Sequence, residues 1–281
     1  MFKKIAVASG KGGTGKTFVA TNLAVSLSRQ HIKTRLLDCD VEAPNSNLFI
    51  HAEWTNSEPV NILVPQVDQD KCNLCGNCHK VCEFNAIGVF GSSVLVFNEL
   101  CHGCGGCRLA CPENAIREVD YPTGVCHYGF AKDLNIVSGE LNIGEAKAPP
   151  VIAAVKKHIA ADEIAIIDAP PGTSCPVVET VRDVDYVILV TEPTPFGYND
   201  LKLSVNLLRK LEKRFGVIIN RSTLGDDRVE EFCLEHEIDI LAKIPYSRTI
   251  AQAYATGKLV IEMDEFKNTF TDIYQAIETR I

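Results

Sequence analysis

The sequence predicts an α/β fold, in which a mostly parallel sheet flanked by helices is interrupted by a small cysteine-rich insert. Short apolar runs alternate with segments of helical period along most of the 281 residues. A glycine-rich segment separates the first apolar run from the first helical segment. Eight of the 12 cysteines lie between Cys72 and Cys111. The first two observations favour crossover connections between parallel strands, and the third marks the insert.

The first elements follow each other closely along the chain. A buried strand is expected over residues 3–9, and the glycine-rich loop comes directly after it. A helix is expected over residues 16–30, because its apolar residues recur on one face. A second strand is expected over residues 34–37, and it ends at two aspartates, Asp38 and Asp40.

Further strands are expected where apolar runs return after the insert. These runs cover residues 164–167, 186–190, 216–219 and 238–244. Segments of helical period separate most of them, notably residues 201–214. The last segment, 265–281, has one apolar stripe and a polar face of mixed charge, so we expect it to pack on the core rather than on a membrane.

The simplest organisation is one α/β domain, built from residues 1–66 and 122–281, with the insert at residues 67–121. The formal net charge is −8 and long basic runs are absent from the sequence, which disfavours binding to nucleic acid or to an anionic membrane. No apolar stretch approaches the ~20 residues of a spanning helix, and the first apolar run is too short for a secretory signal. We therefore expect a soluble cytoplasmic protein.

The glycine-rich loop fits the phosphate-binding pattern G-x-x-x-x-G-K-[ST] between a strand and a helix. Its glycines let backbone N–H groups face phosphate oxygens, and the following helix presents its positive end. Lys16 supplies charge for the β- and γ-phosphates, and the Thr17 hydroxyl is a ligand for Mg²⁺. The residues expected to bind ATP or ADP are Gly10, Lys11, Gly12, Gly13, Thr14, Gly15, Lys16 and Thr17.

The cysteines of the insert form an internal repeat. The run C-x₂-C-x₂-C-x₃-C occurs twice, and the second copy begins 29 residues after the first. This run is typical of bacterial ferredoxins with two [4Fe–4S] clusters, in which the fourth cysteine of each run binds the other cluster. Zinc is the alternative for a cysteine quartet, but the doubled run favours clusters. The first run is followed by Glu83 where the pattern has proline. We expect one cluster on Cys72, Cys75, Cys78 and Cys111, and a second on Cys101, Cys104, Cys107 and Cys82.

The two modules together resemble a known family, the MinD-superfamily P-loop ATPases that carry an inserted ferredoxin domain. The additional lysine, Lys11, gives the loop the deviant form that is found in the MinD, ParA and nitrogenase iron-protein class. The resemblance covers nearly the whole chain and includes the segments 100–107, 168–176 and 191–197. It implies a slow, partner-coupled, Mg²⁺-dependent ATPase that forms a homodimer, or a heterodimer with a related ATPase.

The resemblance also implies roles for individual residues. Lys11 would reach the partner's nucleotide across the dimer and act in catalysis together with Lys16. Asp38 and Asp168 would hold Mg²⁺ with Thr17. Asp40 would position or activate the water that attacks the γ-phosphate. Asn220 would bind the adenine base of the nucleotide. On its own, Asn220 fits a turn-forming asparagine equally well.

The same resemblance implies a role for two cysteines outside the insert. Cys175 lies seven residues after Asp168, where the nitrogenase iron protein carries a cysteine that binds a cluster shared by two subunits. Cys126 is the candidate second ligand for such a third cluster, bridging a dimer. The alternative is that both are non-ligating thiols. Cys233, in a helical stretch, is expected to be a small buried residue.

Two functions remain open. One is an ATPase that couples ATP binding, hydrolysis and dimer closure to electron transfer through the two clusters, with a redox protein as partner. The other is an ATP-dependent carrier that assembles clusters and delivers them to apo iron–sulfur proteins. An ATPase that patterns a membrane or a chromosome is disfavoured, because the sequence has neither a basic amphipathic end nor a basic patch.

Overall fold

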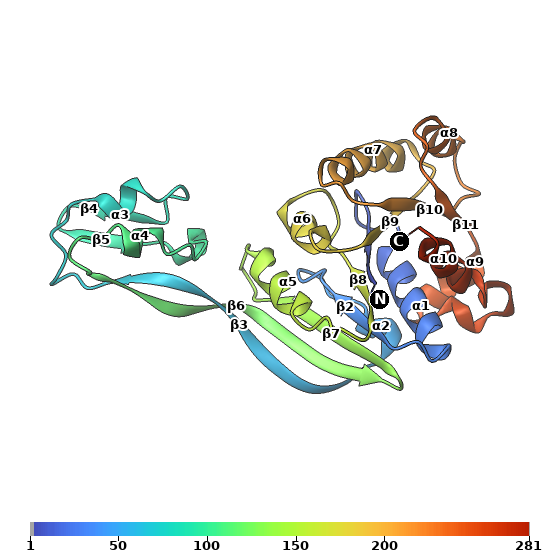
Figure 1. Cartoon of the computed structure of the whole chain (residues 1–281), viewed down its shortest axis with the longest axis horizontal. Coiled ribbons are helices and arrows are strands. Elements are labelled where there is room, and N and C mark those ends of the chain that lie inside the picture. Colours follow the sequence, from blue (N-terminus) through green and yellow to red (C-terminus); the bar gives the residue numbers. More distant parts are fainter. Residues whose placement is uncertain (1–2, 281) are drawn as a thin grey trace.

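A computed structural model describes residues 3–280 of the chain, and its body is built on one nine-stranded sheet (Figure 1). The strand order is β11-β10-β9-β1-β8-β2-β7-β6-β3. Strands β11 to β7 in this order are parallel, and β6 and β3 are added as antiparallel strands at one edge. The parallel strands are β1 (Lys4–Ala8), β2 (Thr34–Asp38), β7 (Leu134–Leu141), β8 (Ile164–Asp168), β9 (Tyr186–Thr191), β10 (Phe215–Asn220) and β11 (Ile240–Ile244).

Helices cover both faces of the parallel sheet, as the alternating pattern predicts. The helices of the body are α1 (Lys16–Arg29), α2 (Asn47–Ile50), α5 (Ala148–Lys156), α6 (Cys175–Val181), α7 (Pro195–Lys210), α8 (Arg228–Glu235), α9 (Arg248–Ala255) and α10 (Thr269–Glu278). Successive residues of β1 enter two different cores: Ile5 packs with α1 and α10, and Ala6 packs with α5, α6 and α7. Because both faces are buried, the strands are continuous apolar runs rather than alternating ones.

The elements expected from the sequence are present, with corrected ends. The helix expected over residues 201–214 begins at Pro195, because Thr194 accepts a hydrogen bond from the Gly197 backbone and caps it. It ends at Lys210. In the last segment, α10 begins at Thr269, and the stripe that includes Phe270 is buried in the core as expected. Ile281 lies outside the described residues.

Two long strands were not expected from the sequence. β3 (Glu53–Val67) and β6 (Ile116–Ala131) pair antiparallel along their length and form a ribbon that extends beyond the body (Figure 1). Most of β3 is exposed, so it lacks the apolar run that reveals a buried strand. The predicted insert boundaries, after residues 66 and 121, fall within this ribbon.

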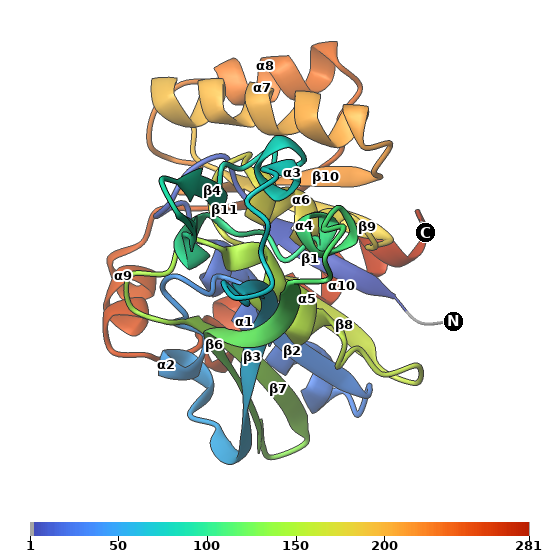
Figure 2. The ribbon, with the colours of Figure 1, turned by 90° about the vertical axis from the view of Figure 1, so that its left-hand side faces the viewer.

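A small lobe, residues 68–115, lies at the far end of the ribbon; we call it the cysteine-rich lobe. Figure 2, turned so that the left-hand side of Figure 1 faces the viewer, places it in front of the body. Its elements are α3 (Asn77–Lys80), β4 (Ile87–Phe90), β5 (Ser93–Val96), the 3₁₀ turn η1 (Asn98–Leu100) and α4 (Gly106–Leu109). Within residues 3–280, no helix is both long and apolar enough to cross a membrane.

Candidate functional site

The glycine-rich loop connects β1 to α1 at the carboxyl edge of the parallel strands. Gly15 precedes α1 with φ +100°, a conformation that side chains rarely adopt. A Cβ atom at Gly15 would lie 2.5 Å from the Asn220 side-chain nitrogen. The loop therefore requires glycine here for both its backbone conformation and its contact with β10.

Three aspartates meet beside this loop. Asp38 and Asp168 end the neighbouring strands β2 and β8 and lie directly opposite each other in register. Thr17 donates a hydrogen bond of 2.6 Å from its hydroxyl to Asp168 Oδ2. Asp38 accepts backbone N–H groups from Asp40, at 3.1 Å, and from Ser46, at 2.9 Å. The parallel register thus brings together acids that lie 130 residues apart.

Burial perturbs these carboxyl groups strongly. Desolvation raises the pKa of Asp168 well above its ordinary value, and the neighbouring Asp38 charge adds to this shift. Desolvation also raises the pKa of Asp38, and raises that of Asp40 to about 6 against the opposing charge of Lys16. Ionising Asp38 and Asp168 together is favoured by additional positive charge, which a divalent cation provides.

The donors around the loop fit Mg²⁺ and a nucleotide. Asp168 Oδ1 is fully buried and has no hydrogen-bond partner within residues 3–280. The same holds for buried oxygens of Thr14, Asn45 and Ser46 in that part of the chain. Carboxylate and hydroxyl oxygens are the ligands that Mg²⁺ prefers, and unpaired buried polar atoms are otherwise costly.

A cavity lies beside the loop at the end of β10. Asn220 donates a 2.8 Å hydrogen bond to the Thr14 carbonyl, so its amide supports the loop in this structure. The cavity is also lined by Tyr246, Ile250 and Tyr254 from the segment that follows β11. These residues were not expected from the sequence, because no motif marks the segment. The arrangement suits a planar base next to the phosphate loop; base reading by Asn220 stays a prediction.

Lys11 contacts an acid of its own chain. Its Nζ atom lies 3.7 Å from Glu192 Oε2, and Glu192 also forms a 2.7 Å ion pair with Arg221. Glu192 is buried at the end of β9, whereas the Lys11 side chain is one-third exposed. Neither Glu192 nor Arg221 was expected at the site from the sequence. The role of Lys11 across a dimer interface stays a prediction.

The eight cysteines of the lobe lie around two cavities. Each cavity is lined by three cysteines of one run and the fourth cysteine of the other. The first has Cys72, Cys75, Cys78 and Cys111, and the second has Cys101, Cys104, Cys107 and Cys82. Within residues 3–280, no three His, Cys, Asp or Glu side chains are arranged around one metal-ion position. A [4Fe–4S] cube instead bonds each thiolate to a different iron, so its four ligands surround a space. Binding of iron here stays a prediction.

The internal repeat extends to the backbone of the lobe. The sulfur of Cys82 accepts the N–H of Ala86 at 3.3 Å, and the sulfur of Cys111 accepts the N–H of Ala115 at the same distance. Helices α3 and α4 are also 29 residues apart. Burial raises the pKa of the Cys107 thiol to about 11. A thiolate at this position therefore needs nearby positive charge, as iron supplies.

The four remaining cysteines have different surroundings. Cys39, Cys126 and Cys233 are buried in the core of the body, as expected for Cys233. Cys175 is exposed at the start of α6. The structure therefore does not place Cys126 and Cys175 on one common surface, and a cluster bridging a dimer through them stays a prediction.

Comparisons with known proteins match this architecture. A family model described as the CobQ/CobB/MinD/ParA nucleotide binding domain matches residues 5–260. The chain is 31% identical over 280 residues to an uncharacterized protein of Methanocaldococcus jannaschii, covering 98% of this chain and 96% of that protein. It is 25% identical over 276 residues to an iron–sulfur cluster carrier protein of Pyrococcus furiosus, covering 90% and 77%.

Solved structures show the same fold. The cell division ATPase MinD of Pyrococcus furiosus has a TM-score of 0.62 and 19% identity, over 100% of both chains. The septum site-determining protein MinD of Pyrococcus horikoshii, complexed with Mg-ADP, has a TM-score of 0.60 and 20% identity, over 99% of this chain and 96% of that chain. With a family match that spans most of its length, this chain belongs to the CobQ/CobB/MinD/ParA nucleotide-binding family, with the P-loop fold of its MinD-like ATPases.

Proposed function

We propose that this protein is a Mg²⁺-dependent ATPase that holds two [4Fe–4S] clusters and controls electron transfer through them to a redox partner. The observation that carries the proposal is the grouping of eight cysteines around two cavities in a chain that also has a phosphate-binding loop. Each cavity receives four thiols, the ligand number that one such cluster takes.

The ATPase site is assigned to residues of the body. Lys16 neutralises the β- and γ-phosphates, and the loop N–H groups hold their oxygens. Thr17, Asp38 and Asp168 are the candidate holders of Mg²⁺, which supplies the charge that offsets the phosphates. Asp40, which lies next to this group, is assigned to orienting the attacking water. The solved relative with Mg-ADP has the same fold, which supports this placement of the nucleotide.

The proposed dimer rests on the resemblance of the phosphate-binding loop to that of the MinD, ParA and nitrogenase iron-protein class. Lys11 leaves Glu192 and contacts the partner's nucleotide when two chains close around ATP. The Lys11 contact to Glu192 is long and partly exposed, so exchanging it costs little. Hydrolysis then removes the contact and reopens the dimer. A homodimer and a heterodimer with a related ATPase both satisfy this scheme.

The clusters, when bound, each accept and release one electron. The residues of the lobe bind the irons through the two groups of four thiols and donate N–H groups to sulfur, as Gly103 does to Cys101 at 3.4 Å. Both groups combine distant parts of the lobe, and two of the cysteines, Cys78 and Cys101, are buried. Each group also has one exposed cysteine, Cys75 or Cys104. Four thiol ligands drawn from both runs favour tightly held clusters over transferable ones.

A second candidate function is cluster delivery to apo iron–sulfur proteins. It is favoured by similarity to several proteins named iron–sulfur cluster carrier protein, including those of Pyrococcus furiosus and Saccharolobus solfataricus. A transferable cluster needs an accessible site, and the exposed Cys175 is the candidate ligand outside the lobe. Electron transfer and delivery therefore differ in how firmly the iron is held.

One experiment separates the two functions. The protein is purified without oxygen, its iron is counted, and it is mixed with an apo-ferredoxin in the presence of ATP or ADP. Electron transfer predicts about eight iron atoms per chain, EPR signals on reduction with dithionite, and retention of iron after mixing. Transfer of iron to the apo-ferredoxin that needs ATP and is lost in Cys175→Ser establishes delivery instead. An iron count near zero refutes both.

A further inference from the structure

The cysteine-rich lobe is joined to the body by a ribbon that is only partly supported. β6 pairs with β7 from Gly124 onward, so the inner half of the ribbon is part of the sheet. In the described part of the chain, residues 61–67 and 116–122 form strand pairs only with each other. A two-stranded ribbon without a third strand is easily bent. A defined position of the lobe therefore requires a second connection to the body.

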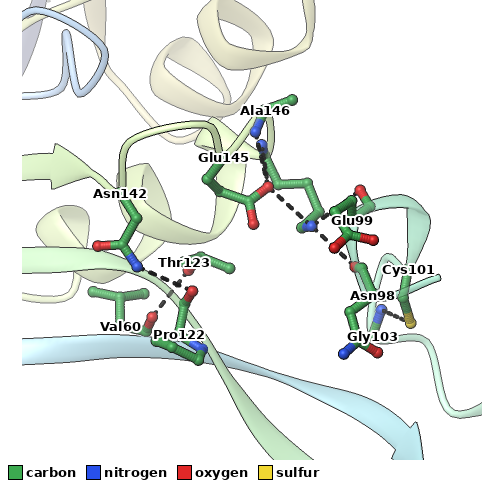
Figure 3. Close-up of polar contacts among 11 residues, drawn as sticks. Val60, Asn98, Glu99, Cys101, Gly103, Pro122, Thr123, Asn142, Glu145 and Ala146 are labelled. Atoms are coloured by element: carbon green, nitrogen blue, oxygen red, sulfur yellow. Dashed lines mark hydrogen bonds and ion pairs between the residues drawn. The ribbon is translucent and has the colours of Figure 1, made fainter. Parts of the chain in front are cut away.

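Lys147 provides this connection. It lies directly before α5, and its Nζ atom donates hydrogen bonds to the backbone carbonyls of Asn98, at 3.2 Å, and Glu99, at 3.1 Å. Figure 3 shows Glu145 and Ala146 of the body facing Asn98 and Glu99 of the lobe, with dashed contacts between the two sides.

The Lys147 ammonium group is buried, and all three of its N–H donors have acceptors. Its side chain is 8% exposed, and it forms a 2.9 Å ion pair with Glu145, whose side chain is 6% exposed. An ammonium group has three N–H donors, and the Glu145 carboxylate and the two carbonyls are three acceptors. Nζ also lies 5.2 Å from the ring centre of Tyr121 on the ribbon. A buried charge is tolerated only with such partners, so the contact holds in one geometry.

The Asn98 carbonyl connects Lys147 to Cys101, a cysteine of the second group. Asn98 accepts the backbone N–H of Cys101 at 3.1 Å as well as the Lys147 ammonium. The Cys101 sulfur in turn accepts the N–H of Gly103. The ammonium charge therefore lies beside the turn that sets the position of Cys101, and it polarises the carbonyl that this turn uses.

The internal repeat supplies a comparison within the molecule. Gln69 occupies the place of Asn98 in the first copy, and its carbonyl accepts the N–H of Cys72 at 3.4 Å. The described residues show no lysine on the Gln69 carbonyl, and the Gln69 side chain instead pairs with the backbone of Val94. The two cysteine groups thus differ in one buried ion pair, whose ammonium end contacts the turn before Cys101.

We propose that Lys147 is a positioning residue that fixes the cysteine-rich lobe on the body and raises the reduction potential of the cluster held by the Cys101 group. The second part rests on the proposed function, and the first part does not. One-electron reduction adds a negative charge to a cluster, so a nearby ammonium favours the reduced form. The two clusters then have different potentials, with the cluster of the Cys101 group accepting an electron first.

The first test uses the full chain as purified without oxygen. In Lys147→Met, we expect amide hydrogen exchange to become faster in residues 98–103 and to stay unchanged in residues 69–74. The double variant Glu145→Gln, Lys147→Met removes the charge left on Glu145, and Gln can still accept the backbone N–H groups of Ala146 and Lys147. The exposed Lys157, at the other end of α5, gives the matched control Lys157→Met. Wild-type exchange over residues 98–103 in both Lys147 variants overturns the positioning role.

The second test is a dithionite titration followed by EPR on the iron-loaded protein. In the double variant, we expect one of the two cluster signals to move to a more negative potential and the other to keep its wild-type value. In Lys147→Arg, which keeps the positive charge, the same signal should keep a potential closer to the wild-type value than in the double variant. Unchanged potentials, or an equal shift of both signals, overturn the electrostatic role. A wild-type protein that binds no iron refutes the proposed function, while the exchange measurement still decides the positioning role.

Discussion

Among the residues of the phosphate-binding loop, Lys16 carries the charge expected to matter most for nucleotide binding. It is buried at the start of α1, next to Thr17 and its bond to Asp168. We expect Lys16→Ala to weaken ATP binding by roughly 10- to 100-fold, because the phosphates lose a charge-assisted contact. Isothermal titration with ATP and Mg²⁺ measures this, with exposed Lys157→Ala as the control. Equal affinity in the two variants contradicts the assignment.

Lys11 is expected to have a different effect, because its proposed target belongs to the partner. We expect Lys11→Ala to leave ATP affinity of the single chain within a factor of about two, and to reduce hydrolysis by roughly 10³-fold, the scale of a charge supplied in trans. Steady-state phosphate release and sedimentation with an ATP analogue measure hydrolysis and dimer formation. Normal hydrolysis in this variant would remove the proposed role of Lys11 across the interface.

At the scale of elements, the loop between β1 and α1 offers a matched pair of glycines. Gly15 has φ +100° and its substitution meets Asn220, whereas a Cβ at Gly12 meets nothing within 4 Å. We expect Gly15→Ala to lower the free energy of unfolding by about 1–3 kcal/mol and Gly12→Ala to change it by less than about 0.5 kcal/mol. Urea unfolding without nucleotide measures both. Similar losses in the two variants would show that the left-handed turn and its contact to β10 do not constrain the loop.

At the scale of the whole molecule, the lobe folds so that each cavity combines both cysteine runs. We expect Cys111→Ser to remove the same EPR signal as Cys72→Ser, and Cys82→Ser to remove the signal that Cys101→Ser removes. The iron content should fall from about eight to about four atoms per chain in each case. If Cys111→Ser instead matches Cys101→Ser, each cluster is held within a single run and the crossed assignment is wrong.

The sequence by itself determined the parallel α/β architecture, because its strands are continuous apolar runs and its helices have local periodicity. It also located the phosphate-binding loop and the doubled cysteine run. Each of these motifs is a set of residues that lie only a few positions apart in the chain. Asp38 and Asp168 were recognisable as strand ends, since an acid after an apolar run is a local signal. All of these features depend on neighbours in the chain.

Only the tertiary structure decided the features that depend on distant residues. The exposed residues of β3 carry no apolar pattern, because the ribbon is held by pairing to β6 rather than by a buried face. The contact of Lys11 with Glu192 and that of Lys147 with Asn98 join segments 181 and 49 residues apart. Neither contact has a local signature, since a charged side chain near a turn usually faces solvent. The order of the strands in the sheet and the course of the ribbon bring these partners together. No short segment of the sequence determines that geometry.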